Sequence, residues 1–141
     1  MNITIKGRGL ELQGILQIPP GAKGIVVFAH GSGSGRFSSR NQFVANVIND
    51  AGIATLLMDL LTPQEEAYDL TTAALRFDIP LLAGRVKEAT RWLMAQPETK
   101  HLQIAYFGAS TGAAAALIAA TKYGVKAVVS RGGRPDLAMN S

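Results

Sequence analysis

Residues 108–112 read Gly-Ala-Ser-Thr-Gly and place Ser110 between two glycines, where an apolar run gives way to a run of small residues. A serine hydroxyl is a weak nucleophile that must be lifted clear of its neighbours to meet a substrate. A very tight strand-to-helix turn does this, and Gly108 and Gly112 would keep the strand and the helix from colliding. We predict that Ser110 is a nucleophile on such a turn. The alternative is an ordinary glycine-containing turn whose serine caps the next helix.

A tetrahedral intermediate formed at Ser110 would need amide donors for its negatively charged oxygen. The backbone N–H of Thr111 is one predicted donor, because it lies at the start of the expected helix, where negative charge is favoured. The second donor is expected in the glycine-rich loop of residues 30–38, and we assign it to Ser32. Such a loop could instead hold a nucleotide phosphate. However, it has neither the lysine of G-x-x-x-x-G-K-[ST] nor the spacing of G-x-G-x-x-G.

A serine nucleophile also needs a base, and the sequence has two histidines, His30 and His101. His101 comes just before the strand that leads to Ser110. At about 3.3 Å per residue this strand places it roughly 20 Å away, at the opposite edge of the sheet, so we exclude it. His30 lies at the correct edge but in the glycine-rich loop. We interpret it as a structural residue that braces the loop, with a role as the base as the alternative.

Two aspartates, Asp136 and Asp59, are expected at the carboxyl edge of the sheet, where Ser110 is also expected. Asp136 is the only carboxylate side chain after Ser110 and is a candidate acid. Its alternative role is structural, at a helix start after Pro135, and this is the role we favour. Asp59, at the end of its strand, is expected to brace the loops rather than to act as the acid.

Strand and helix patterns alternate from residue 24 onward, which predicts a parallel sheet with helices on both faces, preceded by an antiparallel hairpin. The helix over 39–51 is expected to bury a face made of Phe43, Val44, Val47, Ile48 and Ala51. Residues 60–75 have no clear period and are predicted to be a long connection. The remaining expected elements are a hairpin over 3–18, strands over 24–29, 53–58, 102–107 and 125–129, and helices over 78–96 and about 111–123.

Five stretches together resemble the dienelactone-hydrolase branch of the alpha/beta-hydrolase fold family. They are HGSGSGRFSSRNQFVA at 30–45, TLLMDLLTPQEE at 55–66, FDIPLLAGRV at 77–86, GASTG at 108–112 and SRGGRPDLA at 130–138. The resemblance implies an α/β three-layer sandwich and an esterase, lactonase or related hydrolase that works without a metal or an organic cofactor. Enzymes named for dienelactone use a cysteine nucleophile, whereas this chain has Ser110 and no cysteine. The resemblance therefore does not carry dienelactone over as the substrate.

The family's acid and histidine follow the nucleophile along the chain, the acid one strand after the position of Asp136. The resemblance thus implies that residues 1–141 form a single, incomplete alpha/beta-hydrolase domain, the N-terminal two-thirds of a hydrolase whose C-terminal strands are missing. We expect the catalytic acid and histidine beyond residue 141. The last strand would then present an unpaired edge, which a second copy of the chain or a complementing C-terminal chain is expected to cover.

Composition excludes several other classes of function. The net charge is +4, but the basic residues are scattered and aromatic residues make up 6%, so we expect no nucleic-acid partner. The absence of cysteine excludes disulfides and thiolate metal sites. No apolar run approaches the ~20 residues that span a bilayer, and the N-terminus is not of signal-peptide type, so we expect a soluble cytoplasmic protein.

The sequence supports two functions. The first is a serine hydrolase that acts on a small-molecule ester or lactone through an acyl-enzyme, although this chain alone is expected to be inactive. The second is a non-catalytic hydrolase-like scaffold, or an inactive fragment, that binds a small ligand or a complementing chain. The motivation for the second is the missing base.

Overall fold

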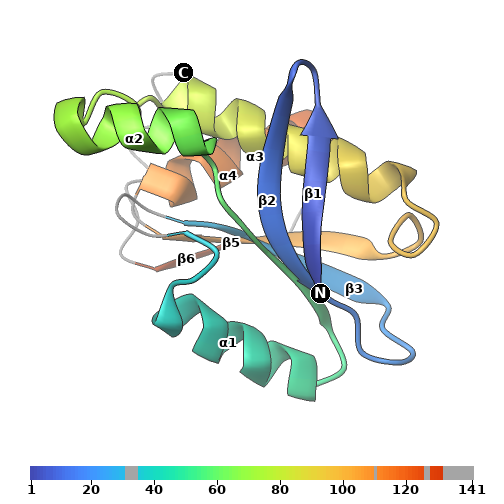
Figure 1. Ribbon diagram of the computed structural model, residues 1–141. Helices are drawn as coiled ribbons and strands as arrows, with labels where there is room; N and C mark the ends of the chain where they lie inside the picture. Colours follow the sequence, from blue (N-terminus) through green and yellow to red (C-terminus); the bar gives the residue numbers. More distant parts are fainter. Residues whose placement is uncertain (31–34, 110, 126–127, 132–141) are drawn as a thin grey trace.

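The computed structural model of the protein describes residues 1–30, 35–109, 111–125 and 128–131. Strands and helices alternate after an N-terminal hairpin, as the sequence predicts (Figure 1). In chain order the elements are β1 (Asn2–Gly7), β2 (Leu10–Gln17), β3 (Gly24–Ala29), α1 (Ser39–Asp50), β4 (Ala54–Met58), α2 (Pro63–Thr72), α3 (Ile79–Ala95), β5 (Gln103–Ala109), α4 (Thr111–Tyr123) and β6 (Val128–Arg131).

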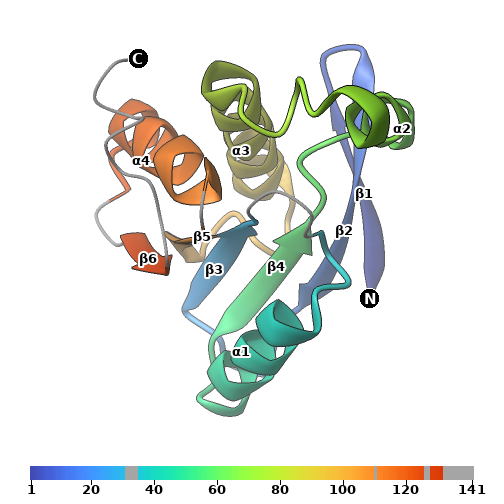
Figure 2. The same ribbon diagram turned by 90° about the vertical axis from the view of Figure 1, so that its left-hand side faces the viewer.

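The strands form one mixed sheet in the order β1-β2-β4-β3-β5-β6. Strand β2 of the hairpin pairs antiparallel with β4. The four strands β3, β4, β5 and β6 run parallel to one another. α1 lies on one face of the sheet, and α3 and α4 lie on the other (Figures 1 and 2). The predicted three-layer α/β architecture with an N-terminal antiparallel hairpin is confirmed. Because parallel strands end at the same edge, the segments that follow β3, β4 and β5 come together there.

The larger apolar core lies between the sheet and helices α3 and α4. It includes alternate residues of β3 and β4, such as Ile25, Val27 and Leu56, together with Leu82, Val86 and the alanines of α4. A smaller cluster formed by Phe28, Ala45 and Leu57 lies under α1. Covering both faces explains why β3 and β4 read as continuous apolar runs instead of alternating ones.

Residues 60–75, predicted to be a connection, instead contain the helix α2. Thr62 caps it: its hydroxyl accepts the N–H of Glu65, and the Glu65 carboxylate accepts the N–H of Thr62. Pro63 fits the first turn, where no backbone donor is needed. Only Asp69 of this helix is buried, so the sequence carries no apolar period that would have revealed it.

The predicted apolar face of α1 is wrong in part. Phe43 and Val47 are 69% and 55% exposed, whereas Ala45 is buried and Val44 and Ile48 pack against the smaller cluster. The helix is therefore rotated so that a narrower stripe meets the sheet. The last strand is also displaced from its predicted range, because Val125 still donates its N–H to Ala120 of α4 and β6 begins at Val128.

Candidate active site

The turn that holds the candidate nucleophile is as short as the sequence predicts. β5 ends at Ala109 and α4 begins at Thr111, so one residue separates strand from helix. Ser110 itself lies outside the described residues, as do the candidate donor Ser32 and the candidate acid Asp136. Their roles, and that of the Thr111 N–H, stay predictions.

The two glycines beside this turn lie against backbone atoms. A Cβ on Gly108 would lie 2.4 Å from Cα of Ala113. A Cβ on Gly112 would lie 2.1 Å from the carbonyl oxygen of Ala29 and 2.3 Å from that of His30. Side chains at these positions would therefore separate α4 from β5 and from the end of β3. The contact of Gly112 also places the 108–112 turn directly beside the start of the glycine-rich loop.

His30 follows β3 and is largely buried. Its Nε2 accepts a hydrogen bond of 3.0 Å from the backbone N–H of Leu60, just after β4. A nitrogen that accepts this bond carries no proton, and its lone pair is directed at Leu60 instead of at a serine hydroxyl. This geometry agrees with the bracing role we predicted for His30. His101 is exposed in the turn before β5, at the opposite end of that strand from residue 110.

Leu60 is held from its other side by a pair that sequence reasoning missed. Arg85 of α3 donates to the carbonyl oxygen of Leu60 at 3.1 Å, and two further N–H groups donate to the Glu65 carboxylate, each at 2.6 Å. The end of β3, the segment after β4, α2 and α3 are thus linked by one chain of hydrogen bonds. The Thr62-x-x-Glu65 spacing of a capping box is a sequence signal for the start of α2, but no local pattern pairs Glu65 with Arg85.

The Arg85 guanidinium lowers the pKa of Glu65 from 4.5 to about 2, while partial burial opposes this shift. Because the folded-state pKa is the lower one, the pair stabilises the fold fully above about pH 4.5 and loses its contribution as the pH falls towards 2. The Glu65 side chain is 26% exposed, so solvent screening reduces the effect. We expect about 1–2 kcal/mol to be lost between pH 5 and pH 3. Urea unfolding at a series of pH values should show this decline, and Glu65→Gln should remove that part of it.

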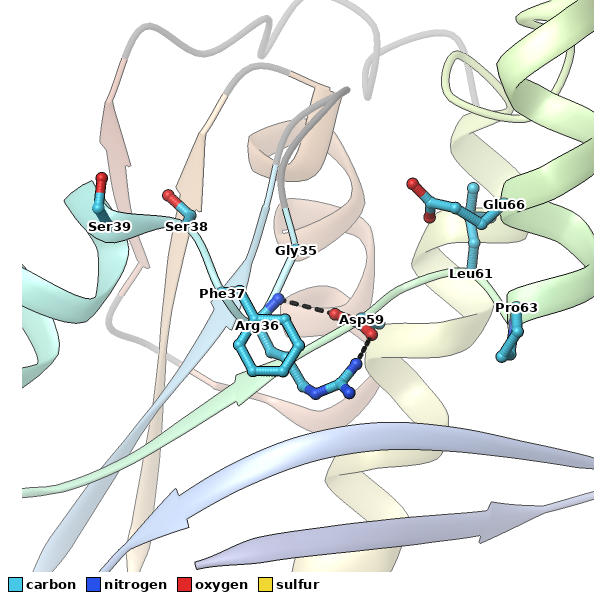
Figure 3. Close-up of a pocket in the computed structure, with 9 residues that line it drawn as sticks. All are labelled: Gly35, Arg36, Phe37, Ser38, Ser39, Asp59, Leu61, Pro63 and Glu66. Atoms are coloured by element: carbon cyan, nitrogen blue, oxygen red, sulfur yellow. Dashed lines mark hydrogen bonds and ion pairs between the residues drawn. The ribbon is translucent and has the colours of Figure 1, made fainter.

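A pocket of about 630 Å³ opens at the same edge of the sheet (Figure 3). We call it the Arg36 pocket. Asp59 holds the residues after the glycine-rich loop: it accepts the backbone N–H of Arg36 at 2.7 Å and pairs with the Arg36 guanidinium. Its role as a brace for the loops agrees with our expectation. The described lining residues are Gly35, Arg36, Phe37, Ser38, Ser39, Asp59, Leu61, Pro63 and Glu66.

Two further features are absent from the part of the chain that the structure describes. No group of three or more His, Cys, Asp and Glu side chains gathers as metal ligands would. No helix there combines the length and apolar character that crossing a bilayer requires.

One solved structure resembles the chain in both sequence and fold, and another resembles it in fold alone. A dienelactone hydrolase from Anabaena variabilis is 57% identical with a TM-score of 0.97, and the match covers 99% of this chain and 66% of that one. Est1E from Butyrivibrio proteoclasticus, solved with ferulic acid bound, is 17% identical with a TM-score of 0.68, covering 89% of this chain and 50% of that one. At this identity the second match shows the fold alone. No protein-family model matches the chain.

A curated relative carries a different name. A Mycobacterium tuberculosis protein named "Putative phosphoribosyl transferase" is 58% identical over 134 residues, which are 94% of this chain and 29% of that protein. The chain thus spans less than a third of this relative and just under two thirds of the dienelactone hydrolase.

Proposed function

We propose that this chain, which belongs to the alpha/beta-hydrolase fold family and is similar to dienelactone hydrolase, carries the nucleophile of a serine hydrolase that acts on esters or lactones. The Ser110 Oγ attacks the carbonyl carbon, the alcohol leaves, and water then hydrolyses the acyl-enzyme. The N–H groups of Thr111 and Ser32 donate to the oxyanion. Neither a metal nor an organic cofactor takes part in this scheme.

The observation that carries the proposal is the packing around the 108–112 turn. One residue joins β5 to α4, and Gly112 lies against the carbonyl groups of Ala29 and His30. A helix N-terminus beside the loop after the first parallel strand is the arrangement that an oxyanion site needs. Space this tight at both glycines supports a constrained elbow over a relaxed loop.

The base and the acid of this reaction are proposed to come from outside residues 1–141, from a longer form of the protein or from a complementing chain. The Nε2 of His30 is already bound to Leu60, and His101 lies at the far end of β5. The chain also covers 66% of the dienelactone hydrolase, which leaves a third of that protein unmatched.

The same observation on His30 favours the second candidate, a hydrolase-like scaffold without catalysis. Loss of the histidine of such a site typically lowers the rate by several powers of ten. A purified chain of residues 1–141 should therefore hydrolyse an activated ester such as 4-nitrophenyl butyrate barely above background. Robust turnover by this chain that is lost on His30→Ala would refute both the scaffold and the outside base. The match to the Mycobacterium tuberculosis protein named as a phosphoribosyl transferase covers 29% of that protein, so it does not support a transferase activity of residues 1–141.

Labelling with a fluorophosphonate probe tests the nucleophile. In a longer form of the protein, or in this chain together with its complementing chain, Ser110 should be labelled and Ser110→Ala should lose all labelling. Ser130→Ala is the matched control, because Ser130 belongs to β6 and is not among the described residues that line the Arg36 pocket, and it should label like the wild type. Equal labelling of the wild type and Ser110→Ala would end the hydrolase proposal.

A further inference from the structure

We infer that the Arg36 pocket discriminates against substrates that place a carboxylate in it, and accepts neutral or cationic groups. This inference rests on the proposed function, because it concerns one arm of the ester whose carbonyl meets Ser110. The inference is drawn from the three charged residues of the pocket, Arg36, Asp59 and Glu66. The other lining residues are neutral.

The pocket lies close enough to the 108–112 turn to receive part of a small ester. Asp59 follows β4 and residue 110 follows β5, with β3 between them. Two strand spacings of about 4.8 Å put the ends of β4 and β5 roughly 10 Å apart. Of the described residues after β3, His30 has its carbonyl oxygen against Gly112, and Gly35 and Arg36 line the pocket.

Arg36 would be the obvious clamp for a carboxylate, but it is already occupied. Its backbone N–H and its guanidinium both bind Asp59, and the two side chains are each only 23% exposed. The guanidinium also lies 4.2 Å from the centre of the Phe37 ring. An arginine that is paired in this way has its charge neutralised and its direction fixed, so it offers an anion little net attraction. Asp59 also lies close against Gly35, since a Cβ on Gly35 would come within 2.8 Å of Asp59 Oδ1.

Glu66 leaves the pocket with excess negative charge. Its carboxylate extends from α2 towards the segment of residues 35–39 (Figure 3). None of the ion pairs found among the described residues includes Glu66. The described lining therefore has one positive and two negative charges, and Leu61 and Pro63 add apolar surface beside them. A carboxylate brought by the ligand would meet repulsion, whereas an alkyl or ammonium group would not.

Binding to the Ser110→Ala chain tests the inference without any need for turnover. Methyl butyrate and monomethyl succinate differ by a terminal carboxylate, and titration of each is followed through the backbone amide resonances of Arg36, Phe37 and Leu61. We expect methyl butyrate to bind about three- to tenfold more tightly, as a partly screened charge at a few ångströms would cause. The difference should shrink in 0.5 M salt.

Two charge variants and a matched control show where the discrimination comes from. Asp59→Asn frees the Arg36 guanidinium and leaves Glu66 as the one negative charge of the described lining, so it should abolish the preference. Glu66→Gln should reduce it about threefold without touching the Arg36 pair. Glu98→Gln, the same charge change at an exposed site outside the pocket, should leave the ratio unchanged.

Equal or tighter binding of monomethyl succinate to the wild-type pocket would overturn the inference. So would an unchanged ratio in both pocket variants, or failure of methyl butyrate to shift the three amide resonances. These outcomes are distinct from failure of the proposed function, which is read from the labelling of Ser110. A pocket with the expected charge preference beside an unlabelled serine would leave a ligand-binding scaffold instead of a hydrolase.

Discussion

Gly112→Ala is expected to lower the free energy of unfolding by more than about 3 kcal/mol. The new methyl group would lie 2.1 Å and 2.3 Å from two carbonyl oxygens at the end of β3. These two oxygens are backbone atoms at the end of the central strand β3, so they cannot rotate out of the way as a side chain could. Forcing atoms into such a site displaces whole elements, and overpacking of this kind lies at the costly end of single substitutions. Urea or thermal unfolding of the purified variant measures the loss.

Gly84→Ala is the matched control. Gly84 lies inside α3, and a Cβ there would meet nothing within 4 Å. Alanine is the better helix former by about 1 kcal/mol, so this variant should be slightly more stable than the wild type. Similar stabilities for the two variants would mean that α4 does not lie against the end of β3, and the proposed nucleophile turn would lose its main support.

Arg85→Met is expected to cost about 2–4 kcal/mol. The arginine side chain is only 8% exposed and satisfies three acceptors at once, the two Glu65 oxygens and the Leu60 carbonyl. Removing one partner of a buried pair leaves the other charge without compensation, which is the costly way to break it. The lower part of this range allows for the water that reaches Glu65. Denaturant unfolding at pH 7 gives the value.

The double variant Arg85→Met, Glu65→Met separates the pair from simple packing. Removing both charges should recover part of the loss, because two apolar side chains need no compensation. A single variant that loses less than about 0.5 kcal/mol, or a double variant that loses the sum of both, would show that the link between α2 and α3 is not made by these charges.

Strands β3 and β4 and the helix α3 could be predicted because buried positions show in the sequence as apolar runs or as an apolar helical period. β3 and β4 are covered on both faces and read as apolar runs, and α3 combines an apolar period with Asp78 as its cap. α2 could not be found in this way, because ion pairs and a capping box fix it instead of an apolar stripe. In α1, exposed Phe43 and Val47 fall on a helical face that the period alone assigns to the core.

In the candidate site, too, some features could be predicted from the sequence and others could not. The one-residue turn and the bracing roles of His30 and Asp59 follow from residue types at the ends of strands. The Arg36–Asp59 and Arg85–Glu65 pairs join residues more than 15 positions apart, and only the folded arrangement of β4, α2 and α3 brings them together. The charge of the Arg36 pocket depends on the Arg36–Asp59 pair and on Glu66, which the fold brings to the same pocket, so composition gave no indication of it.

The strand order also bears on how the protein is synthesised. β3 lies between β4 and β5, both of which come later in the chain. A ribosome adds about 5–20 residues per second, so β3 leaves it several seconds before β5 is available to pair with it. For that time an apolar strand, with Val26 and Val27 at its centre, has an open side. The nascent chain should therefore be most prone to aggregate or to recruit a chaperone before residue 109 has emerged.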